Sequence, residues 1–322
     1  MKRSDFLKNT SKFVLISPLV SELIAETPMK IKSAYKLPLG QELPDPFCLK
    51  TEDGYFLTGT HHSLRKKSKS GGYLFDMFHS RDLINWVSLG QILKFPDFEG
   101  SREGNFWAPE IVPYQGKYYL YYTADSFGNP EKRYVRVAVA EKVNGPYEDC
   151  QVRLTEQPSI DGDPYYVSAD EGYLFYTGNE GNEHVGQLLV DKFVSPTRLE
   201  NKPRKVFPSE TVPWEEGAFL VKKDNGFYLF SSQGNWRNET YHVLAAKAES
   251  ILGPYVRCAK ENSNLRVLST QGVQIGPGHN SVFQGPNSEY YICYHAWDRK
   301  HTGRYCWIAP LEWKDGFPAA KQ

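Results

Sequence analysis

A short aromatic strand repeats five times along this chain. Each copy begins with a turn residue and continues with apolar and aromatic residues, at positions 54–57, 116–120, 172–175, 226–229 and 288–292. The copies are roughly 55 to 60 residues apart, which is too long for a helical solenoid and fits a four-stranded sheet with loops. The sequence therefore predicts an all-β protein, a five-bladed β-propeller, in which the ends of the inner strands share one central pocket.

The repeat spans nearly the whole chain, which predicts a single propeller domain over residues 31–322. Residues 1–30 lie outside the repeat, and Lys2 and Arg3 precede an apolar stretch that Pro18 and Glu22 interrupt. This segment is either an export signal or an N-terminal extension. Export predicts a periplasmic or secreted protein, while a cytoplasmic one stays open. No apolar run of 18 residues occurs elsewhere, so no membrane span is expected.

The charge balance excludes one class of partner. Lys plus Arg and Asp plus Glu both number 38, so there is no basic surplus that would favour nucleic acid. Aromatic residues make up 14% of the chain, a composition common where sugar rings are stacked upon. Tyrosine is also simply a good strand former, which accounts for many of these residues.

Aspartates stand where two inner strands should begin. Asp45 precedes Pro46 before the first aromatic strand, and Asp161 and Asp163 precede the third. A proline after Asp45 predicts an extended backbone there. A lone Asp-Pro is usually a turn opener, but two such sites at equivalent repeat positions favour a shared functional role.

The fourth repeat carries paired acids, Glu215 and Glu216, directly before Gly217. A solvated loop would explain them, and so would a carboxyl whose pKa is raised for general acid catalysis. Carboxylates from three blades would then meet in one funnel. One acid that protonates a leaving oxygen and one base that activates water can together cleave a glycosidic bond.

Several motifs, in order, resemble glycoside hydrolase family 43, the five-bladed propeller enzymes that act on arabinose- and xylose-containing polysaccharides. The resemblance runs from about Leu37 to Pro318. It rests on Asp45-Pro46, Ser-Arg-Asp-Leu-Ile-Asn-Trp at 80–86, Phe-Trp-Ala-Pro-Glu-Ile at 106–111, Ile-Asp-Gly at 160–162, Glu216-Gly217, Gly-Pro-Gly-His-Asn-Ser at 276–281, Tyr-His-Ala-Trp at 294–297, and Gly303-Arg304.

The resemblance implies catalytic roles for three carboxylates. Asp45 would be the general base and Glu216 the general acid, with Glu215 as the competing acid. A second aspartate would orient the acid and tune its pKa. Asp161 matches the sequence context of that residue, whereas Asp163 repeats the spacing from Asp45 to Gly54, so both remain candidates.

The resemblance also implies residues that surround the sugar. Trp107 would lie against it, Arg304 would bind its hydroxyls or the base, and His279 would lie near the propeller axis. The chemistry needs no cofactor, but a structural calcium ion near His279 is compatible with the resemblance. Glu110 is interpreted as structural, and Trp236 as either a subsite wall or a cover for a blade edge.

The expected function is an inverting glycoside hydrolase that cleaves arabinose- or xylose-containing plant polysaccharides or oligosaccharides, acting as an exo-α-L-arabinofuranosidase or a β-xylosidase. No β-sandwich segment follows Gln322, which favours the arabinofuranosidase. The alternatives are an endo-α-1,5-arabinanase and a catalytically inactive carbohydrate-binding propeller. Propeller phosphorylases and invertase-like hydrolases are disfavoured by the motifs at Trp107 and His279.

Overall fold

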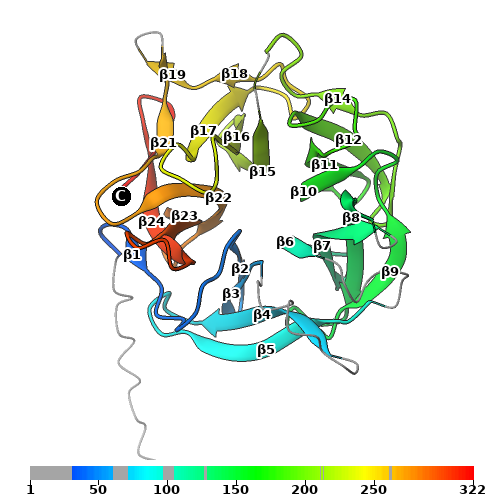
Figure 1. Cartoon of the computed structure of the whole chain (residues 1–322), viewed down its shortest axis with the longest axis horizontal. Helices are drawn as coiled ribbons and strands as arrows, with labels where there is room; N and C mark the ends of the chain where they lie inside the picture. Colours follow the sequence, from blue (N-terminus) through cyan, green and yellow to red (C-terminus); the bar gives the residue numbers. More distant parts are fainter. Residues whose placement is uncertain are drawn as a thin grey trace, which may run out of the picture.

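The computed structural model describes residues 31–60, 72–96, 105–126, 129–210, 212, 214–260 and 263–322. Within these ranges the regular structure is all β, and five sheets surround a central axis (Figure 1). The predicted five-bladed propeller is therefore confirmed. The segment 1–30, with its expected export signal, lies outside the described residues. None of the described segments forms a helix with the length and apolarity needed to cross a membrane.

Each blade is an antiparallel sheet whose first strand lies nearest the axis. Blade 1 is β2 (Phe47–Thr51), β3 (Gly54–Thr58), β4 (Tyr73–Ser80) and β5 (Val87–Lys94). Blade 2 is β6 (Phe106–Tyr114), β7 (Lys117–Ser126), β8 (Asn129–Ala140) and β9 (Glu148–Arg153). Blade 3 is β10 (Ser159–Ser168), β11 (Glu171–Gly178), β12 (Leu188–Ser195), β13 (Arg198–Leu199) and β14 (Arg204–Lys205). Blade 4 is β15 (Glu215–Lys223), β16 (Gly226–Gln233), β17 (His242–Ala248), β18 (Val256–Arg257) and β21 (Arg266–Leu268), with the small pair β19 (Ala259–Lys260) and β20 (Ser263–Asn264) beside it.

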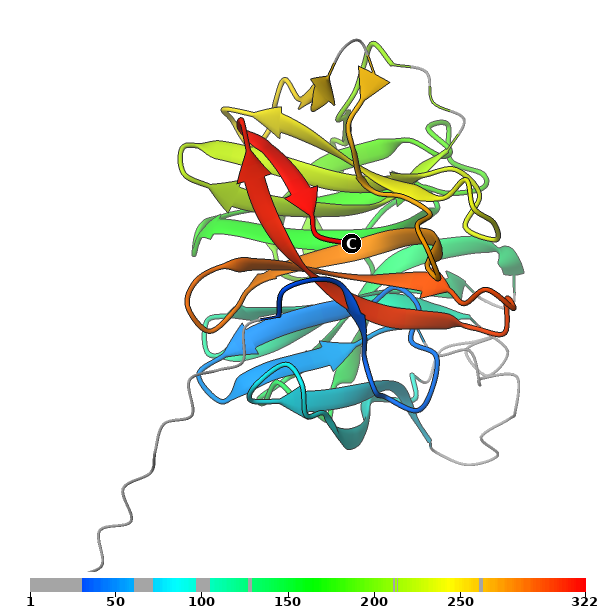
Figure 2. The ribbon, with the colours of Figure 1, turned by 90° about the vertical axis from the view of Figure 1, so that its left-hand side faces the viewer.

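Blade 5 closes the ring with strands from both ends of the described chain. Its order from the axis outward is β22 (Ile275–Gln284), β23 (Tyr290–Trp297), β24 (Arg304–Lys314) and β1 (Tyr35–Lys36), and β25 (Phe317–Ala320) also pairs with β24. Figure 2 looks onto this blade from outside, with β24 and β25 in red. Strand β1 precedes blade 1 in the sequence but pairs with β24 of blade 5. The main-chain hydrogen bonds of this pair therefore join the segment before the first blade to the last blade.

Aromatic pairs fill all five junctions between neighbouring blades. Their ring centroids are 5.5 to 6.3 Å apart, in the order Phe75–Tyr122, Tyr121–Phe193, Phe175–Tyr255, Tyr228–Trp313 and Phe283–Tyr55. Several of these rings come from the repeated second strands that the sequence singles out. The aromatic repeat therefore supplies much of the core between blades, where each ring buries a large apolar area.

A β-bulge recurs near the start of the inner strands. In β6, β10, β15 and β22, two residues of the inner strand stand opposite one residue of the second strand at the register shift. In blade 1, Thr60 N donates to Pro44 O and Phe47 pairs with Thr58, so residues 45–46 occupy the same place. Bulges redirect side chains next to functional sites.

The first residue of each bulge has a positive φ. These five residues, here called the axial positions, are Asp45 (50°), Ala108 (45°), Asp161 (57°), Gly217 (60°) and His279 (47°). The extended backbone that Pro46 predicts for Asp45 is therefore wrong. Aspartate tolerates the left-handed region better than most residues, and the N–H of Asp45 finds an acceptor in His295 Nδ1.

Side chains on the second strands hold the axial positions of the next blade. The backbone N–H groups of Ala108, Asp161 and His279 donate to the hydroxyls of Thr60, Thr123 and Ser232, over 2.8 to 3.0 Å. At the closing junction, Asp45 N donates to His295 Nδ1 instead. At the junction of blades 3 and 4, the Gly217 N–H donates to the Asp161 carboxylate. The ring of blades thus fixes the axial positions through their backbone.

Candidate active site

Asp45 is an ionised carboxylate held between two cationic groups. Its Oδ1 lies 3.4 Å from His279 Nδ1 and 3.5 Å from Arg304 Nη1. Burial opposes ionisation, but the charges of His279 and Arg304 outweigh it and hold the pKa of Asp45 well below its usual value. Asp45 therefore keeps its negative charge over the whole ordinary pH range.

Glu216 lies on β15, and each of its carboxyl oxygens has a hydrogen bond. Oε2 accepts from Trp214 Nε1 at 2.6 Å, and Oε1 accepts from the Tyr241 hydroxyl at 2.7 Å. The next residue, Gly217, is tightly enclosed, because a Cβ at this position would lie 3.1 Å from the His279 ring. The glycine thus allows Glu216 and His279 to approach the same space.

Glu215 points away from this site and is fully buried. It forms a two-pronged ion pair with Arg257, with both N–O distances 2.6 Å, and it accepts a hydrogen bond from Ser231. Neighbouring residues of a strand face opposite sides of the sheet, so only one of the two acids can reach the axis. The structure places Glu216 there and gives Glu215 a structural contact.

Asp161 is the aspartate that the structure brings to the other carboxylates. Its Oδ2 lies 4.0 Å from His279 Nδ1, and it accepts the backbone N–H of Gly217, the residue after Glu216. Burial is the largest cause that raises the pKa of Asp161 to about 7, and the charges of Glu216 and Asp45 add to it against the opposing effect of His279.

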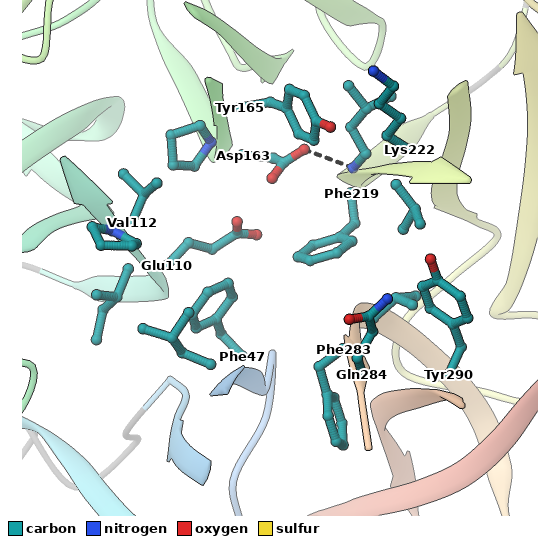
Figure 3. A pocket seen from close by; sticks show the side chains of 17 residues that line it. Phe47, Glu110, Val112, Asp163, Tyr165, Phe219, Lys222, Phe283, Gln284 and Tyr290 are labelled. Atoms are coloured by element: carbon teal, nitrogen blue, oxygen red, sulfur yellow. Dashed lines mark hydrogen bonds between the residues drawn. The ribbon is translucent and has the colours of Figure 1, made fainter. Parts of the chain in front are cut away.

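Asp163 lies further along β10, away from His279. Its Oδ2 accepts the backbone N–H of Leu220 at 2.7 Å, and its carboxyl shares a hydrogen bond with Glu110. Both carboxyls line a cavity of about 320 Å³ between the inner strands, largely among apolar side chains (Figure 3). Burial raises the pKa of Asp163 to about 7 and that of Glu110 well above its usual value.

His279 is surrounded by carboxylates. Burial disfavours its charged form, but Asp45, Asp161 and Glu216 together raise its pKa. Its Nδ1 faces Asp45 and Asp161, as a proton donor would. Among the residues that the structure describes, no three His, Cys, Asp or Glu side chains are grouped to hold a metal ion. A calcium ion near His279 is therefore not confirmed.

Arg304 connects Asp45 to an aromatic wall. Its guanidinium lies 4.5 Å from the centroid of the Trp236 ring, and Trp236 stacks on Trp297 at 6.3 Å with an interplanar angle of 11°. Trp297 Nε1 also donates to the Trp236 carbonyl at 2.7 Å. Both indoles are half-buried, so each keeps some surface open to solvent.

Trp107 stands beside an axial position on another blade. It immediately precedes Ala108, is half-buried, and has the Arg133 guanidinium 4.2 Å from its ring centroid. Aromatic rings of this kind can stack on sugars or pack against cations.

Three residues of the site have no role assigned by the sequence reasoning: Trp214, Tyr241 and His295. His295 falls inside the motif at 294–297 and Trp214 directly precedes the paired acids, but Tyr241 falls in no motif. Gly278 is the one signal for it, because a Cβ there would lie 2.0 Å from Tyr241 Cε1. A glycine that makes room for a distant ring cannot be recognised without the fold.

Comparison with known proteins adds relatives and solved structures. The β-D-galactofuranosidase xynD of Aspergillus niger is 27% identical over 239 residues, which cover 69% of this chain and 65% of the relative. The extracellular exo-α-(1->5)-L-arabinofuranosidase ArbA of Cellvibrio japonicus is 23% identical, covering 69% and 72%. A thermostable family-43 glycoside hydrolase of known structure superposes with a TM-score of 0.74 at 24% identity, covering 89% of this chain and 96% of that one.

The chain spans only part of some curated relatives, between 54% and 65% of the length of three of them. The match to the family model, in contrast, covers most of this chain. The sequence model of the glycosyl hydrolases family 43 matches residues 35–318, from β1 to β25. With the propeller and the converging carboxylates, this match shows that the chain belongs to glycosyl hydrolases family 43.

Proposed function

We propose that this protein is an inverting glycoside hydrolase that cleaves arabinose- or xylose-containing polysaccharides or oligosaccharides, as an exo-acting α-L-arabinofuranosidase or β-xylosidase. The observation that carries the proposal is the convergence of Asp45, Asp161 and Glu216 around His279 at the axis. Relatives named as β-xylosidase, endo-arabinanase and exo-arabinofuranosidase support the substrate class.

Asp45 is the general base of the proposed mechanism. Its low pKa, due to His279 and Arg304 against the effect of burial, keeps it ionised and able to accept a proton from water. That water attacks the anomeric carbon on one face of the sugar while the leaving group departs from the other, which inverts the configuration.

Glu216 is the general acid, and Asp161 supports it. Burial, with the charges of Glu216 and Asp45, raises the pKa of Asp161 to about 7, so Asp161 retains a proton near neutral pH. Glu216, held by Trp214 and Tyr241, protonates the departing oxygen. Asp161, through the Gly217 N–H, fixes the backbone beside Glu216.

The half-buried tryptophans supply apolar surface for a sugar. We assign Trp107 on blade 2 and the Trp236–Trp297 pair to substrate stacking, with Arg304 donating to sugar hydroxyls as well as to Asp45. His279 would bind from beneath, at the axis.

The test uses p-nitrophenyl α-L-arabinofuranoside, p-nitrophenyl β-D-xyloside and the matching oligosaccharides, with wild type, Asp45→Asn and Glu216→Gln. Both variants should lose about 10²- to 10⁴-fold in kcat on oligosaccharides. Glu216→Gln should lose much less on the p-nitrophenyl compounds, because p-nitrophenolate leaves without protonation. Proton NMR of the first-formed sugar should show the inverted anomer.

Other outcomes would change the proposal. Cleavage of linear arabinan at internal bonds, without release of p-nitrophenol, would replace exo action by endo-arabinanase action. Binding of these sugars with no turnover of any of them would indicate a carbohydrate-binding propeller. An anomer of retained configuration would overturn the assignment of Asp45 as a base.

We also propose that residues 1–30 direct export to the periplasm or the medium. Two relatives are named as extracellular proteins, and the segment starts with Lys2-Arg3 before an apolar stretch. N-terminal sequencing of the protein from fractionated cells would test this. Recovery of uncleaved protein in the cytoplasm alone would contradict it.

A further inference from the structure

His295 occupies a place that other blades give to a hydroxyl residue. The residue on the second strand opposite the start of each bulge is Thr60, Thr123, Thr177, Ser232 and His295 in blades 1 to 5. In three of the first four blades this hydroxyl accepts the N–H of the next axial position. Only the closing junction, which holds Asp45, uses an imidazole.

The imidazole contacts both the backbone and the side chain of Asp45. Its Nδ1 accepts the Asp45 N–H at 3.1 Å, as Thr60 Oγ1 does for Ala108, and also lies 3.2 Å from Asp45 Oδ1. The ring also stacks on Tyr241, with centroids 5.9 Å apart and planes 12° from parallel. A serine at this position would keep the contact with the Asp45 backbone and lose the stacking on Tyr241.

Tyr241 continues the connection to the other side of the site. Its hydroxyl donates to Glu216 Oε1 at 2.7 Å, and its ring is 1% exposed. Gly278, the residue paired with His295 on β22, leaves the space that this ring fills. One buried stack therefore lies between the backbone of Asp45 and the carboxyl of Glu216.

The accepting role requires a neutral imidazole. The charged groups that face His295 are Arg304 from β24, His279 from β22 and Asp45 ahead of β2, with the phenol of Tyr241 beside them. Burial, followed by the charge of Arg304, lowers the pKa of His295 to about 4 against the opposing effect of Asp45. The His295 ring is therefore neutral at ordinary pH, as acceptance at Nδ1 requires, while the raised pKa of the nearby His279 favours its charged form.

We propose that His295 is a positioning residue that ties Asp45 and Glu216 into one rigid unit, by binding the backbone of Asp45 and buttressing Tyr241. This inference rests on the proposed function for its catalytic meaning. The positioning role itself can be tested without the proposed function, because it predicts how closely Asp45 is held against His279. Displacing a reacting group by about 1 Å can cost about 10²-fold in rate.

The experiment compares His295→Ser, His295→Asn and the matched control Thr60→Val. Asn can place its Oδ1 where Nδ1 stands, and Thr60→Val removes the equivalent side-chain bond at the junction of blades 1 and 2, which holds Ala108 and not a carboxylate. We expect His295→Ser to lower kcat about 10- to 100-fold with KM changed less than about threefold. His295→Asn should recover part of the loss, and Thr60→Val should stay within about twofold of wild type.

A second readout does not depend on turnover. NMR titration of the His279 ring, assigned with His279→Asn, reports how closely Asp45 pairs with it. In His295→Ser this pairing should weaken, so the pKa of His279 should fall and that of Asp45 should rise, moving the acidic limb of the kcat/KM profile to higher pH. Thr60→Val should titrate like wild type.

The outcomes separate the two proposals. An unchanged His279 titration in His295→Ser, or an equal loss of kcat in Thr60→Val, would overturn the positioning role. A shifted titration in a protein whose wild type turns over none of the sugars would support the role of His295 and reject the proposed hydrolase.

Discussion

At the scale of the residue, the two adjacent acids of β15 show how one strand separates two uses of a carboxylate. Glu215 faces the blade interior and is neutralised by Arg257, whereas Glu216 faces the axis and is held by neutral donors. A buried carboxylate with a two-pronged arginine partner is held in place by that ion pair, and Glu215 faces away from the axis. Of the two acids, the geometry thus brings only Glu216 to the site.

The first prediction concerns the pH dependence of catalysis. Asp45 has a lowered pKa, so the base stays active well into the acid range, while Asp161, beside Glu216, loses its proton as the pH rises through about 7. We therefore expect kcat/KM to be flat through the mildly acidic range and to fall above about pH 7.

Asp161→Asn tests the same coupling. The substitution removes the carboxyl whose pKa is about 7, so the basic limb should move away from pH 7, and kcat should also fall because the Gly217 N–H loses its carboxylate acceptor. The measurement is kcat/KM from pH 4 to 9 for both proteins, with Asp170→Asn, an exposed residue, as the control. A basic limb that does not move in Asp161→Asn would show that Asp161 does not set it.

The choice between Asp161 and Asp163 shows where sequence reasoning stops. The spacing back from Gly172 matches that of Asp45 from Gly54, which favours Asp163. Strand β10 contains a second register shift between Tyr166 and Ser168, so residue counting from the glycine does not measure the position of the bulge. The carboxylate types and their order could be predicted, but a register shift of this kind leaves no reliable sequence signal.

At the scale of the element, the inner strand of a blade combines a regular ladder with one irregular step. The ladder pairs the inner strand with the aromatic second strand that recurs in the sequence. Residue propensities for secondary structure do not predict the bulge, because its first position is filled by residues as different as Asp45, Ala108 and His279. The existence of the strands was therefore predictable, and the direction of the axial side chains was not.

Gly278→Ala provides the prediction at this scale. Its Cβ would lie 2.0 Å from Tyr241 Cε1, so the ring must move and Glu216 loses a donor. We expect a loss of stability of about 1–3 kcal/mol from overpacking and a fall in kcat of about tenfold or more.

The matched control is Gly116→Ala, at the turn between β6 and β7. Gly116 has φ +79° with no atom within 4 Å of a built Cβ, so the substitution introduces backbone strain alone, about 1 kcal/mol. Chemical denaturation and steady-state kinetics of both variants measure the two effects. Full activity in Gly278→Ala would contradict the packing of Tyr241 on the glycine.

At the scale of the whole molecule, the propeller is held as a ring by segments far apart in sequence. Strand β1 pairs with β24, Ala34 N donates to Lys321 O, and the Tyr35 hydroxyl donates to the Leu83 carbonyl of blade 1. Ile31 and Leu37 are buried in the same cluster as residues of blades 1 and 5. The sequence predicts five blades, but not which strand completes the last one.

Removal of this segment is the prediction for the whole molecule. A chain that begins at residue 41 lacks two buried aliphatic side chains that a chain beginning at residue 31 has. Its free energy of unfolding should therefore be lower by at least about 1.5–3 kcal/mol for each of them. Differential scanning calorimetry should show a melting temperature several degrees lower. Equal melting temperatures would mean that β1 contributes nothing to ring closure.

The five axial positions have one further consequence, for how such a site changes over time. Each of them is held from the neighbouring blade through its backbone N–H group. Framework and chemistry are therefore separable at Ala108, the one axial position of the five that carries neither a polar side chain nor a glycine enclosed by His279. A different side chain at position 108 would alter what the funnel accepts while the ring of blades stays as it is.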